Sequence, residues 1–304
     1  MVQITKYRNI YYYLSGVLVG LSILSFLVFG LNLGVDFKGG SLIFGEFQTE
    51  MLSKEEISES LAKYELGDIV VQPSGERGVF IRIKEVSEDT HQEILVTLNE
   101  VALKKNKDNK FLQKSYESVG PSVSSELSSK AINAVAFVLI AIVLFVAFAF
   151  RKVSYPLSSW KYGLATLVAL FHDVIIPVGV FALLGYFYNI EISSAFIAAI
   201  LTVLGYSVHD TIIVFDRVRE NLMRNVGKDF EETVNISVNQ TFVRSLNTSL
   251  TVVLVLISIY LFGGESIKYF ALTLIIGIVA GTYSSIFVGS NVLVSMEKRL
   301  NLKK

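Results

Sequence analysis

The chain has 304 residues, of which 52% are hydrophobic and only 18% are charged, and its mean hydropathy is +0.54. These values are too apolar for a soluble protein of this length and predict a polytopic membrane protein. The net charge is zero and there are no cysteines, which excludes disulfides, zinc–thiolate sites and thiol nucleophiles. The three histidines (His91, His172 and His209) are scattered, so a histidine-rich metal centre is not expected.

The first hydrophobic run, Ile10 to Leu31, is long enough to cross a hydrocarbon core of about 30 Å as a helix. A cleavable signal peptide is the alternative. The run is too long for the apolar region of such a peptide, however, and no small-x-small cleavage site precedes Asn32. We therefore predict a cytoplasmic N-terminus and a first transmembrane helix within residues 1–31.

Residues 32–129 have a mixed, charged composition that indicates a separate folded domain. A serine cap and an acidic first turn predict a helix from Ser53 to Tyr64. Apolar and alternating runs predict strands around it, and the resulting order is β-α-β-β-α-β, the split pattern of a ferredoxin-like α+β sandwich. The other predicted elements are strands over 41–47, 69–72, 79–83 and 111–119 and a second helix over 87–104.

Five further hydrophobic runs lie within residues 130–296 and predict transmembrane helices 2 to 6. The clearest is Ala131 to Phe150, which contains twenty residues without a charge. Gly277 and Gly281 form a G-x-x-x-G pair in the sixth run, as Gly16 and Gly20 do in the first, and such pairs permit close helix packing. The remaining runs are 161–184, 193–216, 241–262 and 267–296, and residues 297–304 form the predicted C-terminal tail.

Six spans place nearly all of the short-loop lysines and arginines on one side of the membrane. The positive-inside rule therefore predicts that both termini are cytoplasmic and that the domain over 32–129 is extracytoplasmic. The only charged residues in or beside the short loops on the opposite side are Glu191, Glu265 and Lys268. The basic residues on the predicted cytoplasmic side are Lys6, Arg8, Arg151, Lys152, Lys161, Arg217, Arg219, Arg224, Lys228, Lys298, Arg299, Lys303 and Lys304.

One carboxylate lies deep within the fourth span, because Asp210 is seventeen residues past Ser193. An ionised carboxylate at that depth costs a few kcal/mol, which a proton or a cation would offset. Arg244 lies one turn inside the fifth span, which enters from the same side, so we predict that the two meet in a proton-coupled switch. The alternatives are that Asp210 is a structural acid satisfied by Arg244 or by hydroxyls such as Ser207 and Thr211, and that Arg244 snorkels.

A second histidine–aspartate pair, His172–Asp173, lies near the middle of the third span and repeats the HDxII pattern of His209–Asp210. Asp173 is a second candidate for proton coupling, because a buried acid is costly there for the same reason. His209 is a candidate proton shuttle near neutral pH. A lone histidine on a span more often donates a hydrogen bond to a neighbouring helix, and that alternative stays open.

The segment GVDFKGG, residues 34–40, joins the first span to the predicted extracytoplasmic domain. Glycines permit tight turns at such a junction, and Asp36 and Lys38 are expected at the membrane surface. We predict that Gly39 and Gly40 form a hinge on which the domain moves. An ordinary polar junction is the alternative.

Four stretches together resemble the SecF family of protein-export membrane proteins: GVDFKGG, VGPSVSSEL (119–127), GYSVHDTIIVFDRVREN (205–221) and RSLNTSLT (244–251). The resemblance covers essentially the whole chain. It implies a multi-pass protein of the bacterial or archaeal cell (inner) membrane that acts with SecD beside the SecY translocon complex. It also implies that the proton-motive force helps to move secreted polypeptides outward, with the family's intramembrane acid and arginine at Asp210 and Arg244. His209 is a departure, since the family usually has asparagine before that acid.

An ion gradient, with protons as the expected ion, would supply the energy, because the chain lacks the G-x-x-x-x-G-K-[ST] loop of ATP-binding proteins. One charge crossing the membrane field is worth about 2.3 kcal/mol per 100 mV, comparable with the energy that separates two packings of a movable domain. No cofactor is expected. The expected partners are SecD, the SecY translocon complex, the translocating polypeptide and membrane lipid, and nucleic acid is not among them.

Enzymatic activity is not expected, because no nucleophile–base–orienter set and no metal-ligand spacing appears. Two alternatives from other functional classes stay open. The first is half of a proton-driven lipid or small-molecule exporter of the resistance-nodulation-division (RND) type, which the family resembles in its span arrangement. The second is a scaffold that only positions the extracytoplasmic domain and moves no ion.

Overall fold

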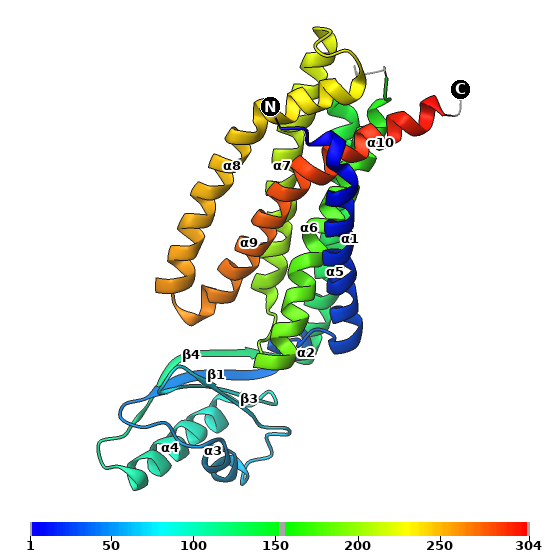
Figure 1. Ribbon diagram of the computed structural model, residues 1–304. Helices are drawn as coiled ribbons and strands as arrows, with labels where there is room; N and C mark the ends of the chain where they lie inside the picture. Colours follow the sequence, from blue (N-terminus) through cyan, green and yellow to red (C-terminus); the bar gives the residue numbers. More distant parts are fainter. Residues whose placement is uncertain (1, 152–155, 303–304) are drawn as a thin grey trace. The chain divides into compact units, whose positions relative to one another are not determined.

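The computed structural model describes residues 2–151 and 156–302 (Figure 1). Met1, Lys152, Lys303 and Lys304, which belong to the predicted termini and to a predicted cytoplasmic loop, lie outside the described residues. The chain divides into two compact units, which we call the helical unit and the α+β unit. The helical unit comprises Met1–Leu31, Ile132–Ile190 and Ala195–Lys304, and the α+β unit comprises Asn32–Ala131 and Glu191–Ser194.

The α+β unit contains a four-stranded antiparallel sheet in the order β2-β3-β1-β4. Its elements follow the predicted succession of strand, helix, strand, strand, helix and strand (Figure 1). Strand β1 is central, with Ile43 opposite Ile81 of β3 on one side and opposite Tyr116 of β4 on the other. The bounds are β1 Gly40–Phe47, α3 Lys54–Leu61, β2 Val70–Ser74, β3 Gly78–Ile83, α4 Glu88–Lys105 and β4 Phe111–Val119.

Local sequence explains where the helices of this unit begin. Ser53 Oγ accepts a hydrogen bond from Glu56 N at 3.1 Å, and Glu56 Oε2 accepts one from Ser53 N at 2.7 Å, so the two form a capping box before α3. The backbone bond from Ser53 is the main reason that the pKa of Glu56 is lowered. Ser87 caps α4 in a similar way through Thr90 N. Residues of one sheet face and of the inward faces of both helices then pack in one core, which includes Ile43, Phe47, Val79 and Ile81 of the strands and Ile57, Leu61, Ile94 and Leu98 of the helices.

Six helices of the described chain are long and apolar enough to cross a membrane, as predicted. The most apolar stretch is 44% buried in α6, 44% buried in α7 and 67% buried in the last span. In the other three spans it is at most 17% buried. Both buried carboxylates described in the helical unit, Asp173 and Asp210, lie on two of the three more buried spans. The bounds are α1 Arg8–Phe29, α5 Pro121–Ala149, α6 Ser159–Tyr188, α7 Ser194–Met223, α8 Phe230–Phe262, α9 Glu265–Ser284 and α10 Ser290–Asn301.

Some helices differ in extent from their hydrophobic runs. Helix α8 begins at Phe230 and not near Thr241, because Asp229 caps it: Asp229 Oδ1 accepts a hydrogen bond from Glu232 N at 2.7 Å. The last span is not one regular helix, since a π-helical turn, Ser285–Gly289, separates α9 from α10. Helix α10 continues through the first residues of the predicted tail to Asn301. A short helix that the sequence did not predict, α2, occupies Val35–Lys38 within the junction segment.

Candidate functional site

Asp210 lies on α7 and is fully buried where α7, α8 and α9 meet. Its Oδ2 atom accepts a hydrogen bond from Ser249 Oγ of α8 at 3.4 Å, and that hydroxyl also bonds Thr282 Oγ1 of α9 at 2.5 Å. Its Oδ1 atom is buried and has no hydrogen-bond partner among the described residues. A carboxylate with one long hydrogen bond and one bare oxygen is costly in an apolar setting unless a proton or a cation compensates it.

Arg244, the predicted partner of this acid, lies on the exposed side of α8. Within residues 2–151 and 156–302, no ion pair joins it to Asp210, so their pairing stays a prediction. After Arg244 in the sequence, the next buried residues of α8 are Ser245 and Ser249, which lie one turn apart. Ser245 Oγ is also buried and has no hydrogen-bond partner in the described part of the chain. The inward side of α8 beside Asp210 therefore carries hydroxyls and no cation.

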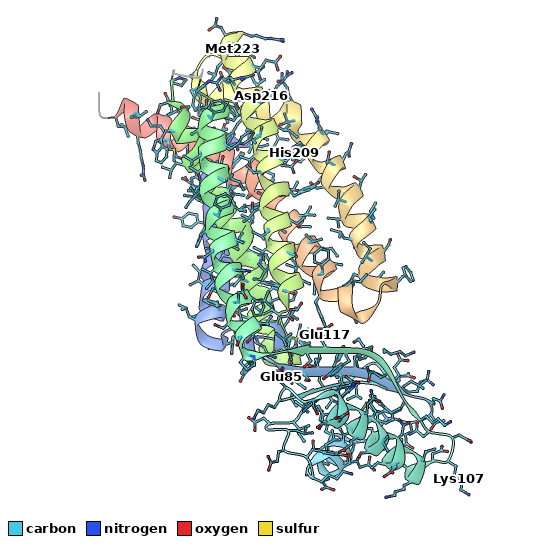
Figure 2. The ribbon with its side chains drawn as sticks, turned by 180° about the vertical axis from the view of Figure 1, so that it is seen from behind. Glu85, Lys107, Glu117, His209, Asp216 and Met223 are labelled. Atoms are coloured by element: carbon cyan, nitrogen blue, oxygen red, sulfur yellow. The ribbon has the colours of Figure 1, made fainter. Side chains whose placement is uncertain are left out.

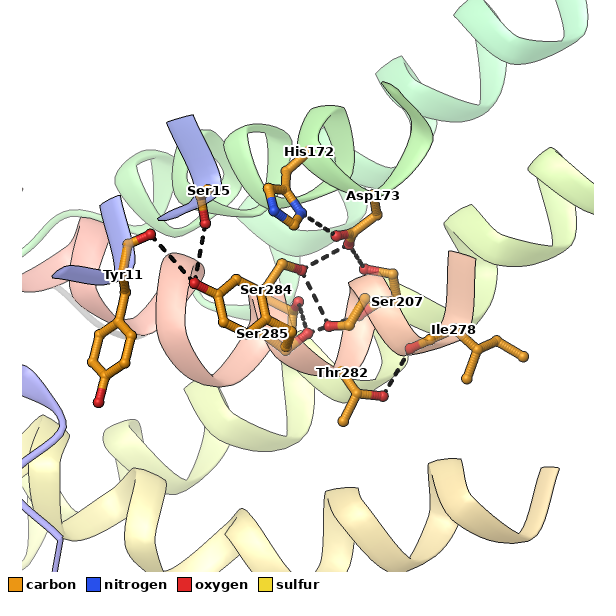
Figure 3. Close-up of polar contacts among 12 residues, drawn as sticks. Tyr11, Ser15, His172, Asp173, Ser207, Ile278, Thr282, Ser284 and Ser285 are labelled. Carbon is orange, nitrogen blue, oxygen red and sulfur yellow. Dashed lines mark hydrogen bonds and ion pairs between the residues drawn. The ribbon is translucent and has the colours of Figure 1, made fainter. Parts of the chain in front are cut away.

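Asp173 on α6 is fully buried and, unlike Asp210, fully paired (Figure 3). Its Oδ1 atom lies 2.9 Å from His172 Nδ1. Its Oδ2 atom accepts hydrogen bonds from Ser207 Oγ of α7 and, at 2.8 Å, from Ser284 Oγ of α9. Three donors from three helices therefore converge on one carboxylate, which joins α6, α7 and α9.

The hydroxyls near Asp210 in the sequence do not bind it. Ser207 donates to Asp173, and Thr211 Oγ1 bonds Ser285 Oγ at 2.8 Å. Ser207 and Thr211 share one face of α7, since four residues separate them, and both meet α9 at its end. Sequence reasoning missed Ser284, the last residue of α9, and Ser285, the first residue of the π-helical turn. Such turns often occur at functional sites, but the run of small residues there gave no signal for one.

His172 is nearly fully buried, and it connects the Asp173 cluster to α1. Its ring stacks on Tyr283 with ring centroids 5.8 Å apart. The Tyr283 hydroxyl donates to the carbonyl oxygen of Tyr11 at 3.3 Å and accepts from Ser15 Oγ at 3.3 Å (Figure 3). Since Nδ1 of His172 faces Asp173, the free ring nitrogen is Nε2, which is buried and unpaired among the described residues.

His209 lies beside Asp210 on α7 but is exposed, as is Asp216 nearer the end of that helix (Figure 2). The two histidines of the HDxII repeats lie on different helices and in different surroundings, since His172 is buried and His209 is exposed. His172 is part of a buried cluster, whereas the role of His209 as a proton shuttle stays a prediction.

The glycines of the last span pack as the G-x-x-x-G pattern predicts. A Cβ atom added at Gly277 would overlap the Val203 side chain of α7, and one added at Gly281 would lie 3.0 Å from Ser207 Cβ. Helix α9 therefore approaches α7 closely beside Asp173. The Gly16–Gly20 pair of α1 has open space around it, so it makes no such contact within the described chain.

The junction segment is strongly bent at its glycines. Gly39 and Gly40 have φ angles of +76° and +121°, which only glycine adopts without strain, and a Cβ atom at Gly40 would lie 2.6 Å from the Ile83 carbonyl oxygen. Asp36 Oδ2 accepts a hydrogen bond from Ser194 N at 2.6 Å. Partial burial and then the nearby Arg82 charge lower the pKa of Lys38. Whether these two glycines act as a hinge stays a prediction.

Among the described residues, no group of three histidine, aspartate or glutamate side chains is arranged to hold a metal ion. The buried polar groups described in the helical unit include two carboxylates, one histidine, three asparagine amides and a series of hydroxyls. Such groups can accept and release protons or order a small cation.

Comparison with known proteins gives a consistent result. Residues 99–299 match the family described as "Protein export membrane protein SecD/SecF, C-terminal", and residues 24–43 match the "SecD/SecF GG Motif". The chain is 42% identical to protein translocase subunit SecF of Thermobaculum terrenum, over 98% of this chain and 95% of that protein. It is 38% identical to SecF of Desulfurispirillum indicum, over 94% of this chain and 88% of that protein.

Two solved structures of SecDF are also similar. The crystal structure of SecDF, a translocon-associated membrane protein from Thermus thermophilus, superposes with a TM-score of 0.82 at 30% identity. The match covers 97% of this chain and 38% of that chain, so this chain spans little more than a third of the length of SecDF. A structure of SecDF in a super-membrane-facing form gives a TM-score of 0.64 at 31% identity, over 98% of this chain and 39% of that chain.

Proposed function

This chain belongs to the SecF family of protein-export membrane proteins, and from that premise we propose that it is an accessory subunit of the Sec protein-translocation machinery that acts with SecD. The proton-motive force acts on Asp210 and Arg244 and moves the α+β unit, a ferredoxin-like domain outside the cytoplasm, which assists export of secreted polypeptides. The observation that carries this proposal is the state of Asp210, a fully buried carboxylate with one long hydrogen bond and one unpaired oxygen. The role is transport and not catalysis, and it uses an ion gradient in place of a cofactor.

The proposed switch has two packings of α8. In the first, Asp210 carries a proton and α8 presents Ser245 and Ser249 to it, which is the arrangement described above. In the second, Asp210 is ionised and α8 presents Arg244. A rotation of α8 by about 100°, the angle between successive helical residues, exchanges Ser245 for Arg244 at the inward position. Only 17% of the apolar stretch of α8 is buried within this chain, so few packing contacts oppose a rotation of that stretch, whereas the first turns of the helix pack in the core through Phe230, Val234 and Val238.

The available energy is sufficient for such a switch. One elementary charge that crosses the whole field gains about 2.3 kcal/mol at 100 mV, which shifts a two-state equilibrium by about 40-fold. Asp173 is a second proposed proton site, but its three donors favour a fixed carboxylate that holds α6, α7 and α9 together. We therefore expect α8 to move relative to α6, α7 and α9, which the Asp173 carboxylate holds together.

Substitutions of Arg244 test the proposal. Arg244→Gln is expected to reduce proton-motive-force-dependent export by more than about tenfold, because the ionised Asp210 carboxylate then has no cation with which to form an ion pair. Arg244→Lys is expected to retain part of the activity. The measurement is export into proteoliposomes that contain SecD and the translocon, with and without an imposed gradient. Arg224→Gln, an exposed arginine paired with Glu220, is the matched control. Equal export by Arg244→Gln and the control would contradict the proposed role.

The proposed orientation has a direct test, because the chain has no cysteines. Lys107→Cys in the α+β unit is expected to react with an impermeant maleimide added outside intact cells, and Met223→Cys is expected to react only after permeabilisation (both residues are labelled in Figure 2). Both side chains are exposed, so burial does not limit the reaction. The reverse pattern would place the α+β unit in the cytoplasm.

The competing function is half of an RND-type lipid or small-molecule exporter. The α+β unit of this chain, Asn32–Ala131 with Glu191–Ser194, is small for the outer tunnel that such an exporter builds. Co-purification with the translocon is expected for a secretion subunit, whereas proton flux stimulated by a lipid or a drug is expected for the exporter. A scaffold would retain its function when Asp210 and Arg244 are neutralised together.

A further inference from the structure

The loop between α6 and α7 belongs to the α+β unit, although the helical-unit segment Ile132–Ile190 separates it from the rest of that unit in sequence. Ile192 N donates a hydrogen bond to the Asn32 carbonyl oxygen, and Gly34 N donates one to the Ile192 carbonyl oxygen, each at 2.9 Å. Leu33 and Ile192 form a parallel bridge between these bonds. The segment that leaves α1 therefore holds this loop by backbone pairing.

Asp36 extends this contact to the first residue of α7. Its Oδ2 atom accepts a hydrogen bond from Ser194 N at 2.6 Å, and α7 begins at Ser194. The first backbone N–H groups of a helix have no partner within the helix, and a carboxylate satisfies one of them and also favours the positive end of the helix dipole. Asp36 thus caps α7 from a distant part of the chain.

Two further residues fit the loop closely. A Cβ atom added at Gly34 would lie 3.0 Å from the Ile192 carbonyl oxygen, so a larger residue there would push the loop away. Arg82 of β3 forms an ion pair with Glu191, and their side chains are only 15% and 19% exposed. Arg82 follows the Gly39–Gly40 junction in sequence, whereas Asp36 precedes it. The loop is therefore held both by the junction segment and by the sheet.

Helix α7 is continuous from Ser194 to Asp210. Asp210 is sixteen positions after Ser194, which corresponds to about 24 Å at 1.5 Å per residue, a length over which a helix transmits rotation and displacement along its axis. We propose that Asp36, with Gly34 and the Arg82–Glu191 pair, positions α7 and through it Asp210, so that movement of the α+β unit and the state of Asp210 are linked through this helix. The inference rests on the proposed function, in which Asp210 responds to the ion gradient.

Amide hydrogen exchange of the full chain in lipid nanodiscs tests the linkage. Asp36→Ala removes the cap, and exchange at residues 192–196 is expected to accelerate by about fivefold. Asp36→Asn keeps an acceptor oxygen that caps helices as well as aspartate does, so exchange is expected to stay within about twofold of the parent. Glu76→Ala, an exposed acid in the turn between β2 and β3, is the matched control and is expected to change nothing.

The reciprocal measurement addresses the coupling itself. Asp210→Asn, which holds that residue neutral, is expected to alter exchange at residues 192–196 by about threefold or more, since linkage acts equally in both directions. Unchanged exchange there, together with faster exchange in Asp36→Ala, would overturn the proposal and leave Asp36 as a local cap only. Equal exchange in Asp36→Ala and Glu76→Ala would overturn it as well.

Export by the same variants separates this inference from the proposed function. Asp36→Ala is expected to lower gradient-dependent export by about fivefold and Asp36→Asn to restore it, in line with their exchange rates. If Asp210→Asn alters exchange at 192–196 but leaves export intact, the proposed function fails and the linkage stands. If Asp210→Asn abolishes export and exchange at 192–196 does not respond, the linkage fails and the proposed function stands.

Discussion

Asp210→Asn is expected to abolish the stimulation of export by the proton-motive force, a loss of about 40-fold at 100 mV if one charge crosses the field. Asparagine has the size of the acid and can keep the hydrogen bond to Ser249, but it cannot gain or lose a proton. The measurement is export into proteoliposomes with SecD and the translocon, with the gradient present and after an uncoupler has removed it. Export without the gradient is expected to be unchanged.

Two controls accompany this prediction. Asp210→Glu keeps a titratable carboxyl and is expected to retain a measurable response to the gradient. Asp216→Asn replaces an exposed acid on the same helix, whose partner is Arg219 at 2.8 Å, and is expected to behave as the parent. A normal gradient response in Asp210→Asn would refute the role proposed for this residue, whatever the result of the Arg244 substitutions.

Asp173→Ala is expected to lower the stability of the helical unit by about 3 kcal/mol, because it leaves three buried donors without their acceptor. These donors are His172 Nδ1, Ser207 Oγ and Ser284 Oγ, which come from α6, α7 and α9. The measurement is thermal unfolding of the purified chain in detergent, followed by tyrosine and tryptophan fluorescence. An unchanged midpoint would contradict the view that this carboxylate joins the three helices.

Asp173→Asn separates the structural role from proton coupling at the same position. The amide keeps an acceptor oxygen for the serine hydroxyls, so most of the stability is expected to remain. If export also remains, Asp173 is a structural acid. If export is lost in a stable protein, the proton site predicted at Asp173 from the HDxII repeat is supported. Ser284→Ala removes one donor and is the matched control for stability alone.

The elements that were predictable from sequence are those with strong local signals. Strand β4 has the predicted bounds, Phe111–Val119, because apolar and aromatic residues recur along it and a turn and Gly120 flank it. Helix α3 begins after Ser53, where the capping box is visible in the sequence as serine followed three residues later by glutamate. The long apolar runs were sufficient to predict six membrane helices.

The parts that were not predictable depend on distant residues. Ser284 donates to Asp173 across 111 positions, and Ser194 donates to Asp36 across 158. No local pattern relates such residues. Hydropathy likewise misses the polar first turns of α8, which lie before the apolar run, and the π-helical turn, whose residues are as apolar as those around it. Sequence therefore identified both buried acids but not the hydroxyls that distinguish them.

The α+β unit is discontinuous in the chain, and this bears on how the protein is made. Its sheet and helices are complete once residue 131 has been synthesised, but the strand-like partner of Leu33 and the partner of Arg82 lie in Glu191–Ser194. During synthesis those residues follow α5 and α6, so the unit acquires its last contacts only after both helices have been made. A fragment cut at residue 131 would lack them, and its Arg82 would lose its ion-pair partner Glu191.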